Sequence, residues 1–306
     1  MKENILVTRG LSKKYRNFTA LEGADITVRK GDIYALIGRN GAGKTTLMKV
    51  ISGLTEKSGG EFELFSRKGS DIEGEKKRIG CLIENPSFFE KLTVYNNLRY
   101  YAVQKGITDM NQIDEVLNMV KLTDARNKKY KNLSLGMKQR LGIAFAFMDN
   151  PDLVILDEPI NGLDPIGISE LRDTFSRLNR EKGVTFIISS HILSELYLIA
   201  NRFLFIEKGK VIKEITRSEL DRECMRCTVI KTSNNKKAAA MLEEILSIND
   251  YKVIDSSEIR IYDDSIRPEV INATLIKNGL DISALYESGI TLEEYFKSLI
   301  GGSNNA

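Results

Sequence analysis

The sequence has one histidine, three cysteines and no tryptophan among its 306 residues. A single histidine excludes any metal site with two or more histidine ligands, and it leaves His191 as the one imidazole available for catalysis. Three cysteines are too few for a disulfide framework, so we expect a protein of a reducing compartment.

Long apolar runs are also missing. The longest uninterrupted one, residues 143–148, is much shorter than the roughly 18 residues that a membrane-spanning helix needs. The N-terminus carries Lys2, Glu3 and Arg9 around a very short apolar patch, which is not typical of a signal peptide. We therefore expect neither a membrane span nor a secretion signal.

Neither sign of charge dominates, with 45 Lys+Arg against 42 Asp+Glu. A dedicated nucleic-acid binder usually carries a basic stripe, so we expect no nucleic acid among the partners. The charge is nevertheless uneven. From Thr216 onward there are 11 basic and 15 acidic residues, so this part carries −4 and residues 1–215 carry +7. This split indicates two parts, of which the basic one suits an anionic ligand.

Apolar patterning predicts an α/β fold, and with 42% hydrophobic residues the chain can bury a core. Strand-like runs alternate with helical patterns, which predicts a mainly parallel sheet. Ile113, Val116, Leu117 and Val120 share one helix face, so we expect a helical insert over about 88–150. The predicted strands of this part lie at 5–8, 24–28, 33–37, 153–156 and 184–189, with further short strands within 60–83.

A second, smaller α/β domain is expected over residues 216–306, after a short polar linker near 207–220. Its predicted strands lie at 228–231, 252–254 and 259–262, and its predicted helices at 236–246, 268–278 and 291–300.

A glycine-rich turn between a predicted strand and a predicted helix fits the pattern G-x-x-x-x-G-K-[ST]. Its glycines let backbone N–H groups cradle phosphates, and the following helix directs its positive end at them. Lys44 reaches the outer phosphates, and the Thr45 hydroxyl is a ligand for Mg²⁺. The pattern predicts a nucleotide phosphate site without distinguishing ATP from GTP. Its residues are Gly38, Arg39, Asn40, Gly41, Ala42, Gly43, Lys44, Thr45 and the adjacent Thr46.

Two adjacent acids end the apolar strand at 153–156. Asp157 is placed to hold Mg²⁺ directly or through water. Glu158, one residue further, is placed to act as general base on the attacking water. Alone this pair is a weak signal, but together with the phosphate loop it predicts nucleotide hydrolysis.

Between these two motifs, residues 133–140 read LSLGMKQR. Here the chain resembles the ATP-binding subunits of ABC transporters, whose L-S-G-G-Q stretch contacts the γ-phosphate held by a partner subunit. Ser134 and Gly136 match that motif, whereas Leu135 and Met137 depart from it. The resemblance covers about residues 3–215. It implies an ATP-binding cassette of the P-loop NTPase class, with a mixed sheet core and a helical subdomain.

The resemblance implies further roles. His191 stands where the family places a histidine that contacts the γ-phosphate and the attacking water, and Tyr15 stands where an aromatic ring stacks on adenine. ATP and Mg²⁺ are the implied cofactors. Two copies would sandwich two ATP molecules, and a separate transmembrane permease would supply the path. We accordingly expect the protein at the cytoplasmic face of the cell membrane.

Glu84 follows the predicted strand around residue 80, where most members of the family carry glutamine. One interpretation is drift at a tolerant position. The other is subfamily identity, because Glu84 together with the C-terminal stretch 291–296 resembles exporters of bacitracin and lantibiotic peptides. Our hypothesis is that Glu84 is a Mg²⁺ ligand that couples the helical insert to the permease.

Two other motifs are weaker indications of a functional site. Cys224 and Cys227 form a single C-x-x-C without enough further ligands for zinc, and without the context of a redox motif. The pairs 88–89 and 100–101 are aromatic, and they either belong to the core or form a groove for a permease helix. Two alternative functions remain: a soluble ABC ATPase acting on ribosomes or nucleic acid, and a regulatory ATPase module.

Overall fold

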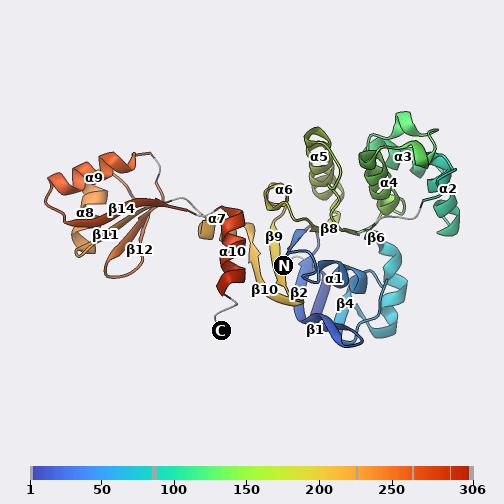
Figure 1. The fold of residues 1–306 in the computed structure, drawn as a ribbon, viewed down its shortest axis with the longest axis horizontal. Coiled ribbons are helices and arrows are strands. Elements are labelled where there is room, and N and C mark those ends of the chain that lie inside the picture. The colour runs from blue at the N-terminus through green and yellow to red at the C-terminus, as the bar shows by residue number, and fades with distance from the viewer. Residues whose placement is uncertain (1–2, 85–87, 225–226, 264, 290, 303–306) are drawn as a thin grey trace. The chain divides into compact units, whose positions relative to one another are not determined.

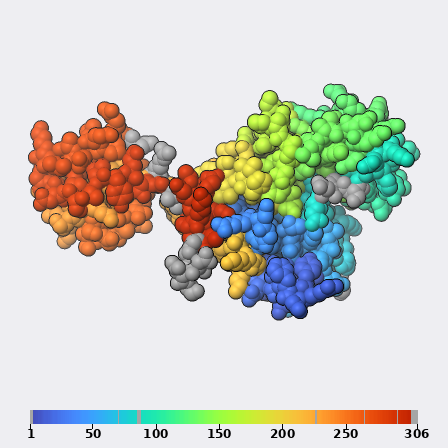
Figure 2. Space-filling view, viewed as in Figure 1, coloured from blue at the N-terminus to red at the C-terminus, as the bar shows by residue number. Residues whose placement is uncertain are grey.

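The computed structural model describes residues 3–84, 88–224, 227–263, 265–289 and 291–302. The chain forms two compact units, Met1–Arg217 and Ser218–Ala306. The colour scale runs from blue to yellow through the first unit and through orange to red in the second (Figure 1; Figure 2). In the described part of the chain, no helix is both long and apolar enough to cross a bilayer.

The first unit is built on a six-stranded sheet with the order β10-β9-β3-β8-β7-β6. All neighbouring pairs are parallel except β9 and β10, so the predicted mainly parallel sheet is confirmed. Every residue of β3, β7 and β8 is buried, as their unbroken apolar runs predict. The strands are β3 (Ile33–Ile37), β6 (Ile79–Leu82), β7 (Leu153–Leu156), β8 (Thr185–Ser189), β9 (Arg202–Glu207) and β10 (Lys210–Thr216).

A second sheet of the first unit is antiparallel and has the order β2-β1-β4-β5. Its first two strands are much longer than predicted, because irregular register shifts along the hairpin let it continue past polar residues. The prediction of strands alone over 60–83 is wrong, since a polar 3₁₀ segment separates β5 from β6. The elements are β1 (Asn4–Tyr15), β2 (Phe18–Arg29), β4 (Gly59–Leu64), β5 (Arg67–Lys68) and η1 (Gly69–Arg78).

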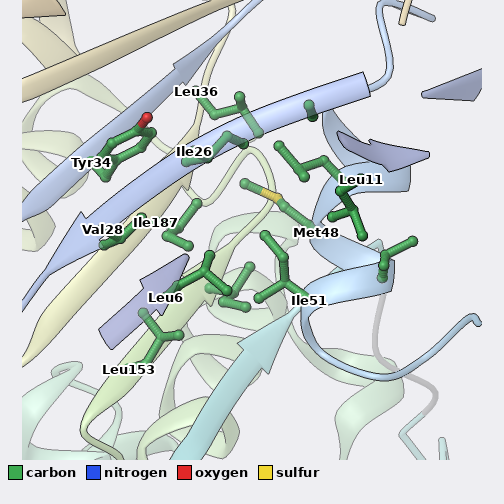
Figure 3. Packing of buried hydrophobic residues seen from close by; sticks show 14 of the residues in the cluster. Leu6, Leu11, Ile26, Val28, Tyr34, Leu36, Met48, Ile51, Leu153 and Ile187 are labelled. Carbon is green, nitrogen blue, oxygen red and sulfur yellow. The ribbon is translucent and has the colours of Figure 1, made fainter. Parts of the chain in front are cut away.

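Helix α1 (Lys44–Ile51) packs into the hydrophobic core that the two sheets of the first unit share. Figure 3 shows Met48 and Ile51 of α1 beside Leu11 of β1, with Leu36 of β3 in the same cluster. All four side chains are at most 1% exposed. Burial of such side chains contributes about 1.5–3 kcal/mol each, so the helix that follows the glycine-rich turn is firmly anchored in the core.

The predicted helical insert contains three helices, and two short 3₁₀ turns lie between the second and the third. The expected apolar face of α3 is buried, with Ile113 and Leu117 fully covered. Two further helices lie outside the insert: α5 follows β7 and α6 follows β8. Their bounds were not predicted from the sequence. The elements are α2 (Val94–Gln104), α3 (Asn111–Met119), η2 (Thr123–Ala125), η3 (Tyr130–Asn132), α4 (Leu135–Phe147), α5 (Pro165–Lys182) and α6 (Leu193–Tyr197).

The prediction of a linker near 207–220 is wrong, because β10 and α7 (Arg217–Cys224) occupy this stretch. Its polar sequence reflects an edge position: β10 pairs on one side only, and most of its residues are half-buried. Polar composition therefore marks the rim of a sheet here instead of an unstructured connection.

The second unit contains a β-α-β-β-α-β arrangement with the antiparallel strand order β12-β13-β11-β14, which is the ferredoxin-like topology. Helices α8 and α9 pack with Ile230, Ile259 and Ile261 into one core, so they cover one face of the sheet. Predicted elements match except β14, which was missed. The elements are β11 (Cys227–Thr232), α8 (Asn235–Glu244), β12 (Tyr251–Val253), β13 (Glu258–Ile261), α9 (Pro268–Lys277), β14 (Ile282–Ser288) and α10 (Leu292–Gly302).

Candidate functional site

The glycine-rich turn joins β3 to α1, the strand and helix that its motif requires. Gly43 has φ +109°, and a Cβ there would lie 2.7 Å from the carbonyl oxygen of Ala20. A Cβ on Gly38 would lie 2.4 Å from the carbonyl oxygen of Ile206. Glycine is therefore required at both positions by close approach to β2 and β9, besides its role toward a ligand.

The backbone at the start of α1 is suited to bind an anion. Gly43 offers no side-chain cap, and the first turn of α1 holds no acidic residue. The first N–H groups of the helix thus remain available to an acceptor from outside. They open on a cavity of about 300 Å³, lined by Phe18, Ala20, Arg39, Asn40, Gly41, Ala42, Gly43, Lys44, Thr45, Thr46, Asp157 and Glu158.

The Lys44 ammonium is folded into the turn. Its Nζ donates to the carbonyl oxygen of Gly38 at 2.6 Å and to that of Arg39 at 3.3 Å, and the residue is 6% exposed. It also lies 3.9 Å from Oε1 of Glu158. A nearly buried positive charge whose one carboxylate neighbour lies at 3.9 Å attracts an anionic ligand into the cavity.

Asp157 lies at the end of β7 beside the first turn of α1. The Thr45 hydroxyl donates to its Oδ2 at 2.6 Å, and the Ser189 hydroxyl donates to its Oδ1 at 2.5 Å. A carboxylate and a hydroxyl side by side are the hard oxygen donors that Mg²⁺ prefers. The residues present therefore fit the expected metal, although no group of three or more His, Cys, Asp or Glu clusters among the described residues.

Glu158 and His191 form a contact pair at the mouth of the cavity. Nδ1 of His191 lies 2.7 Å from Oε2 of Glu158, and the backbone N–H of His191 donates to the same oxygen at 3.2 Å. The N–H of Glu158 donates to Ser189 Oγ at 2.9 Å, and Gln139 donates to the Glu158 carbonyl at 3.3 Å. Glu158 has φ +50°, a strained backbone that is typical of functional positions.

The structure adds residues that the sequence did not single out. Ser189 contacts both acids, and Gln139 holds the Glu158 backbone. Phe18 lines the cavity and is 63% exposed, whereas Tyr15 is not among the lining residues and lies under the Lys13 ammonium at 4.8 Å. An aromatic residue three positions after Tyr15 was the available signal for Phe18.

The signature residues are not brought to this cavity. Ser134 is exposed and caps α4, where its hydroxyl accepts the N–H of Met137 at 3.3 Å. Gly136 lies against the chain at Leu163 and Gly162. Neither Ser134 nor Gly136 lines the chain's own phosphate cavity. Their surface is therefore separate from the chain's own phosphate cavity.

Glu84 is also outside the cavity lining. Its carboxylate pairs with Nζ of Lys49 on α1 at 2.6 Å, and its side chain is 63% exposed. The backbone of Glu84 has φ +62°. The contact thus connects the chain just after β6 to the phosphate-binding helix, on Lys49 and not on Thr45 or Asp157.

Both interpretations of the aromatic pairs apply to part of them. Phe88 is 8% exposed and packs edge-on against Tyr101 at 5.8 Å between ring centroids. Phe89 and Tyr100 are 45% and 48% exposed, and their rings lie 4.8 Å apart. One turn further along α2, Val103 is 63% exposed. We call Phe89, Tyr100 and Val103 the α2 patch.

The cysteines show no site. All three are free, and burial raises the pKa of the Cys224 and Cys227 thiols. A raised pKa disfavours the thiolate that metal binding and redox chemistry need.

Comparison with known proteins identifies the family. Residues 21–161 match the ABC transporter family. The chain is 42% identical over 305 residues to the bacitracin transport ATP-binding protein BcrA of Enterococcus faecalis, with 99% of each chain covered. It is 42% identical over 210 residues to the lantibiotic transport ATP-binding protein SrtF of Streptococcus pyogenes, covering 69% of this chain and 90% of SrtF.

A solved structure shows the same fold. It is a dimeric ATP-binding cassette in a post-hydrolysis state with ADP and phosphate, and it matches with a TM-score of 0.64 at 24% identity. The match covers 69% of this chain and 98% of that cassette. The resemblance drawn from the motifs is thus confirmed, and the chain belongs to the ATP-binding subunits of ABC transporters, which are ATPases with the P-loop cassette fold.

Proposed function

We propose that this subunit hydrolyses ATP with Mg²⁺ to power export of a peptide antibiotic of the bacitracin class. The observation that carries the proposal is the continuous set of contacts from Thr45 through Asp157 and Ser189 to Glu158 and His191 beside the phosphate cavity. The substrate class is supported by similarity to BcrA along 99% of both chains.

The phosphates of ATP fit the cavity at the start of α1. Backbone N–H groups of the glycine-rich turn supply directed donors, and Lys44 supplies the positive charge. Phe18 lines the same cavity and offers a ring for stacking, and the exposed ring of Tyr15 lies three residues before it in the sequence. Thr45 and Asp157 would hold Mg²⁺, which when bound neutralises phosphate charge.

Glu158 is the proposed general base. Its Oε2 is held by His191, and its Oε1, which lies 3.9 Å from Nζ of Lys44, is the oxygen that we assign to a water molecule. The water gives a proton to this carboxylate while its oxygen bonds to the γ-phosphorus, and the bond to the β-phosphate oxygen breaks to release ADP. His191 orients the carboxylate and, being 55% exposed, can also reach the γ-phosphate.

The exposed signature supports assembly with a second copy. Ser134 and Gly136 do not line the cavity of their own chain, so a partner's ATP is the ligand we assign to them. Two copies related by a two-fold axis would then complete two sites reciprocally. The dimeric cassette with the same fold supports this arrangement.

The α2 patch is the surface that we assign to a transmembrane permease. Phe89, Tyr100 and Val103 expose apolar area on a rigid helix whose other face is packed. Exposed aromatic and aliphatic side chains in contact with one another are typical of a docking surface. Binding there would place the protein at the cytoplasmic face of the membrane. We propose no nucleic acid as a partner.

The test is ATP hydrolysis by the chain co-purified with a candidate permease, with and without bacitracin. We expect hydrolysis that bacitracin stimulates, and a Glu158→Gln variant that binds ATP but hydrolyses it at least about 100-fold more slowly. Glu195→Gln, in an ion pair outside the cavity, is the matched control and should hydrolyse normally. Undiminished hydrolysis by Glu158→Gln would refute the assigned base, and hydrolysis indifferent to peptides of this class would refute the substrate.

A further inference from the structure

Strand β14 forms an edge of the sheet in the second unit, and among the described residues no strand pairs with its outer side. An edge strand presents a row of unpaired N–H and C=O groups to any chain that can add a strand. The inner side pairs with β11 in unbroken register from Cys227↔Ser288 to Lys231↔Ala284, and one register shift precedes the last pair, Thr232↔Ile282.

Proteins usually protect such edges with charge or short length. In the described part of the chain the other sheet edges are short or carry several charges. β6 has four residues, β2 carries Glu22, Asp25 and Arg29, and β10 carries Lys210, Lys213 and Glu214. β5 consists of Arg67 and Lys68, and β12 has three residues with Lys252 in the middle. β14 has seven residues, ISALYES, and Glu287 is its one charged side chain. Among the long edge strands that the structure describes, β2, β10 and β14, the last carries the least charge.

Apolar side chains accompany this edge. Tyr286 is 44% exposed and pairs with Val229, on the sheet face opposite the helices. On the other face, α9 packs against β14 and carries Val270 and Ile276, which are 43% and 54% exposed. A strand added at β14 would therefore gain contacts with side chains as well as backbone hydrogen bonds.

We infer that the second unit is a pairing module, in which β14 of one copy adds antiparallel to β14 of a second copy. Such a contact uses the same surface twice, as a two-fold axis requires. With the axis at the middle residue, Leu285, the strand sequence is compatible with itself: Glu287 lies opposite Ser283, and Tyr286 lies opposite Ala284. No charged residue faces its own copy.

The inference rests on the proposed function in one respect, since the ATP-bound dimer supplies the second copy. A contact between two short strands is small and weak on its own. Two second units joined to cassettes that already share two ATP molecules have a high effective concentration, commonly about millimolar for short connections. The strand contact would then stabilise the dimer and persist when nucleotide leaves.

The experiment uses the full chain carrying Glu158→Gln, with ATP, and measures the monomer–dimer equilibrium by sedimentation velocity. Adding Tyr286→Lys should raise the dimer dissociation constant by roughly tenfold, because it places two ammonium groups near the axis. Val253→Lys is the matched control at the opposite edge, on an equally exposed residue of β12, and should change nothing.

A second measurement needs no substitution in β14. Backbone amide exchange of residues 282–288 should slow in the dimer relative to the monomer. An unchanged dissociation constant for Tyr286→Lys, or unchanged exchange in the dimer, would overturn the inference. Protection of β14 that appears only when permease is added would also overturn it and would assign the edge to a permease strand.

Failure of the proposed function is distinguishable from failure of this inference. If the Glu158→Gln chain does not dimerise with ATP, the sandwich is wrong. The pairing is then measured with the nucleotide-free chain at high concentration, where the 34.5 kDa monomer should associate and Tyr286→Lys should prevent it. A nucleotide-free chain that stays monomeric in that experiment would overturn the inference.

Discussion

Nδ1 of His191 lies 2.7 Å from Oε2 of Glu158, although the two residues stand 33 positions apart in the sequence. β7 ends just before Glu158 and β8 ends just before His191, and the two strands are parallel neighbours. The contact is therefore produced by two carboxyl ends meeting at one edge of a sheet, which is where α/β folds place their ligands.

His191→Ala should reduce ATP hydrolysis by roughly 10²–10⁴-fold while ATP binding is retained, because it frees the carboxylate of the general base without touching the phosphate loop. Its imidazole is largely exposed, so the fold should be unchanged. His191→Gln keeps a hydrogen-bond donor and should recover part of the rate. Single-turnover hydrolysis measures both variants, and wild-type turnover by His191→Ala would contradict the assignment.

Gly43→Ala should weaken ATP binding by about tenfold or more. The added Cβ would meet the backbone oxygen of Ala20 at 2.7 Å in a left-handed backbone, so the loop itself must move. Gly74→Ala is the matched control, because a Cβ there meets nothing within 4 Å. Titration with a fluorescent ATP analogue tests this. Equal affinities of the two variants would mean that the loop tolerates the side chain.

Glu84→Ala and Lys49→Ala should each leave ATP binding intact and each reduce the stimulation of hydrolysis by permease and peptide. The pair joins the segment after β6 to α1 at 2.6 Å, and an exposed ion pair contributes only about 0–1 kcal/mol to stability. The double variant should be no worse than either single one. Glu73→Ala, from the exposed pair with Lys76 on η1, is the control.

The same two variants test the hypothesis that Glu84 is a metal ligand. A ligand role predicts that Glu84→Ala raises the Mg²⁺ concentration needed for half-maximal hydrolysis and that Lys49→Ala does not. Equal Mg²⁺ dependence in both variants would support the ion pair as the working contact of Glu84.

Glu170→Gln should destabilise the cassette by roughly 1 kcal/mol at neutral pH. Glu170 on α5 accepts from Lys121 and Arg140, each at 2.8 Å, and these hydrogen bonds lower the pKa of its carboxyl below the ordinary 4.5. A lowered folded-state pKa means that the stabilisation is complete above about pH 5 and is lost as pH falls through the folded-state value.

The difference in unfolding free energy between wild type and Glu170→Gln should therefore be constant from pH 8 to about 5 and shrink below that. Urea unfolding over this range measures it. A difference that grows on acidification would show that the two basic partners do not act through the ionised carboxylate.

Local motifs made the centre of the site predictable from the sequence. The glycine-rich turn is contiguous, so its strand, loop and helix follow from residues 33–51 alone. Asp157 and Thr45 are 112 positions apart, yet each belongs to a motif with a Mg²⁺ role, so the sequence predicted that they would share a site. The predicted bounds of buried strands such as β7 were exact, because an unbroken apolar run begins and ends at definite residues.

Contacts without a local pattern were not predictable. Ser189 looks like any serine after an apolar strand, and only the order of β7 and β8 shows that it contacts both acids. β10 was taken for a linker because an edge strand needs little apolar sequence. β14 was missed for a similar reason, since its few apolar residues do not alternate cleanly with polar ones.

The Ser189 hydroxyl links the positions of the two acids in the site. One oxygen donates to Asp157 at 2.5 Å and accepts from the backbone of Glu158 at 2.9 Å. A displacement of β8 against β7 would thus move the acid at the metal position and the acid at the water position together. The positions of the two carboxylates are thus coupled. The site is aligned for both metal binding and water activation, or for neither.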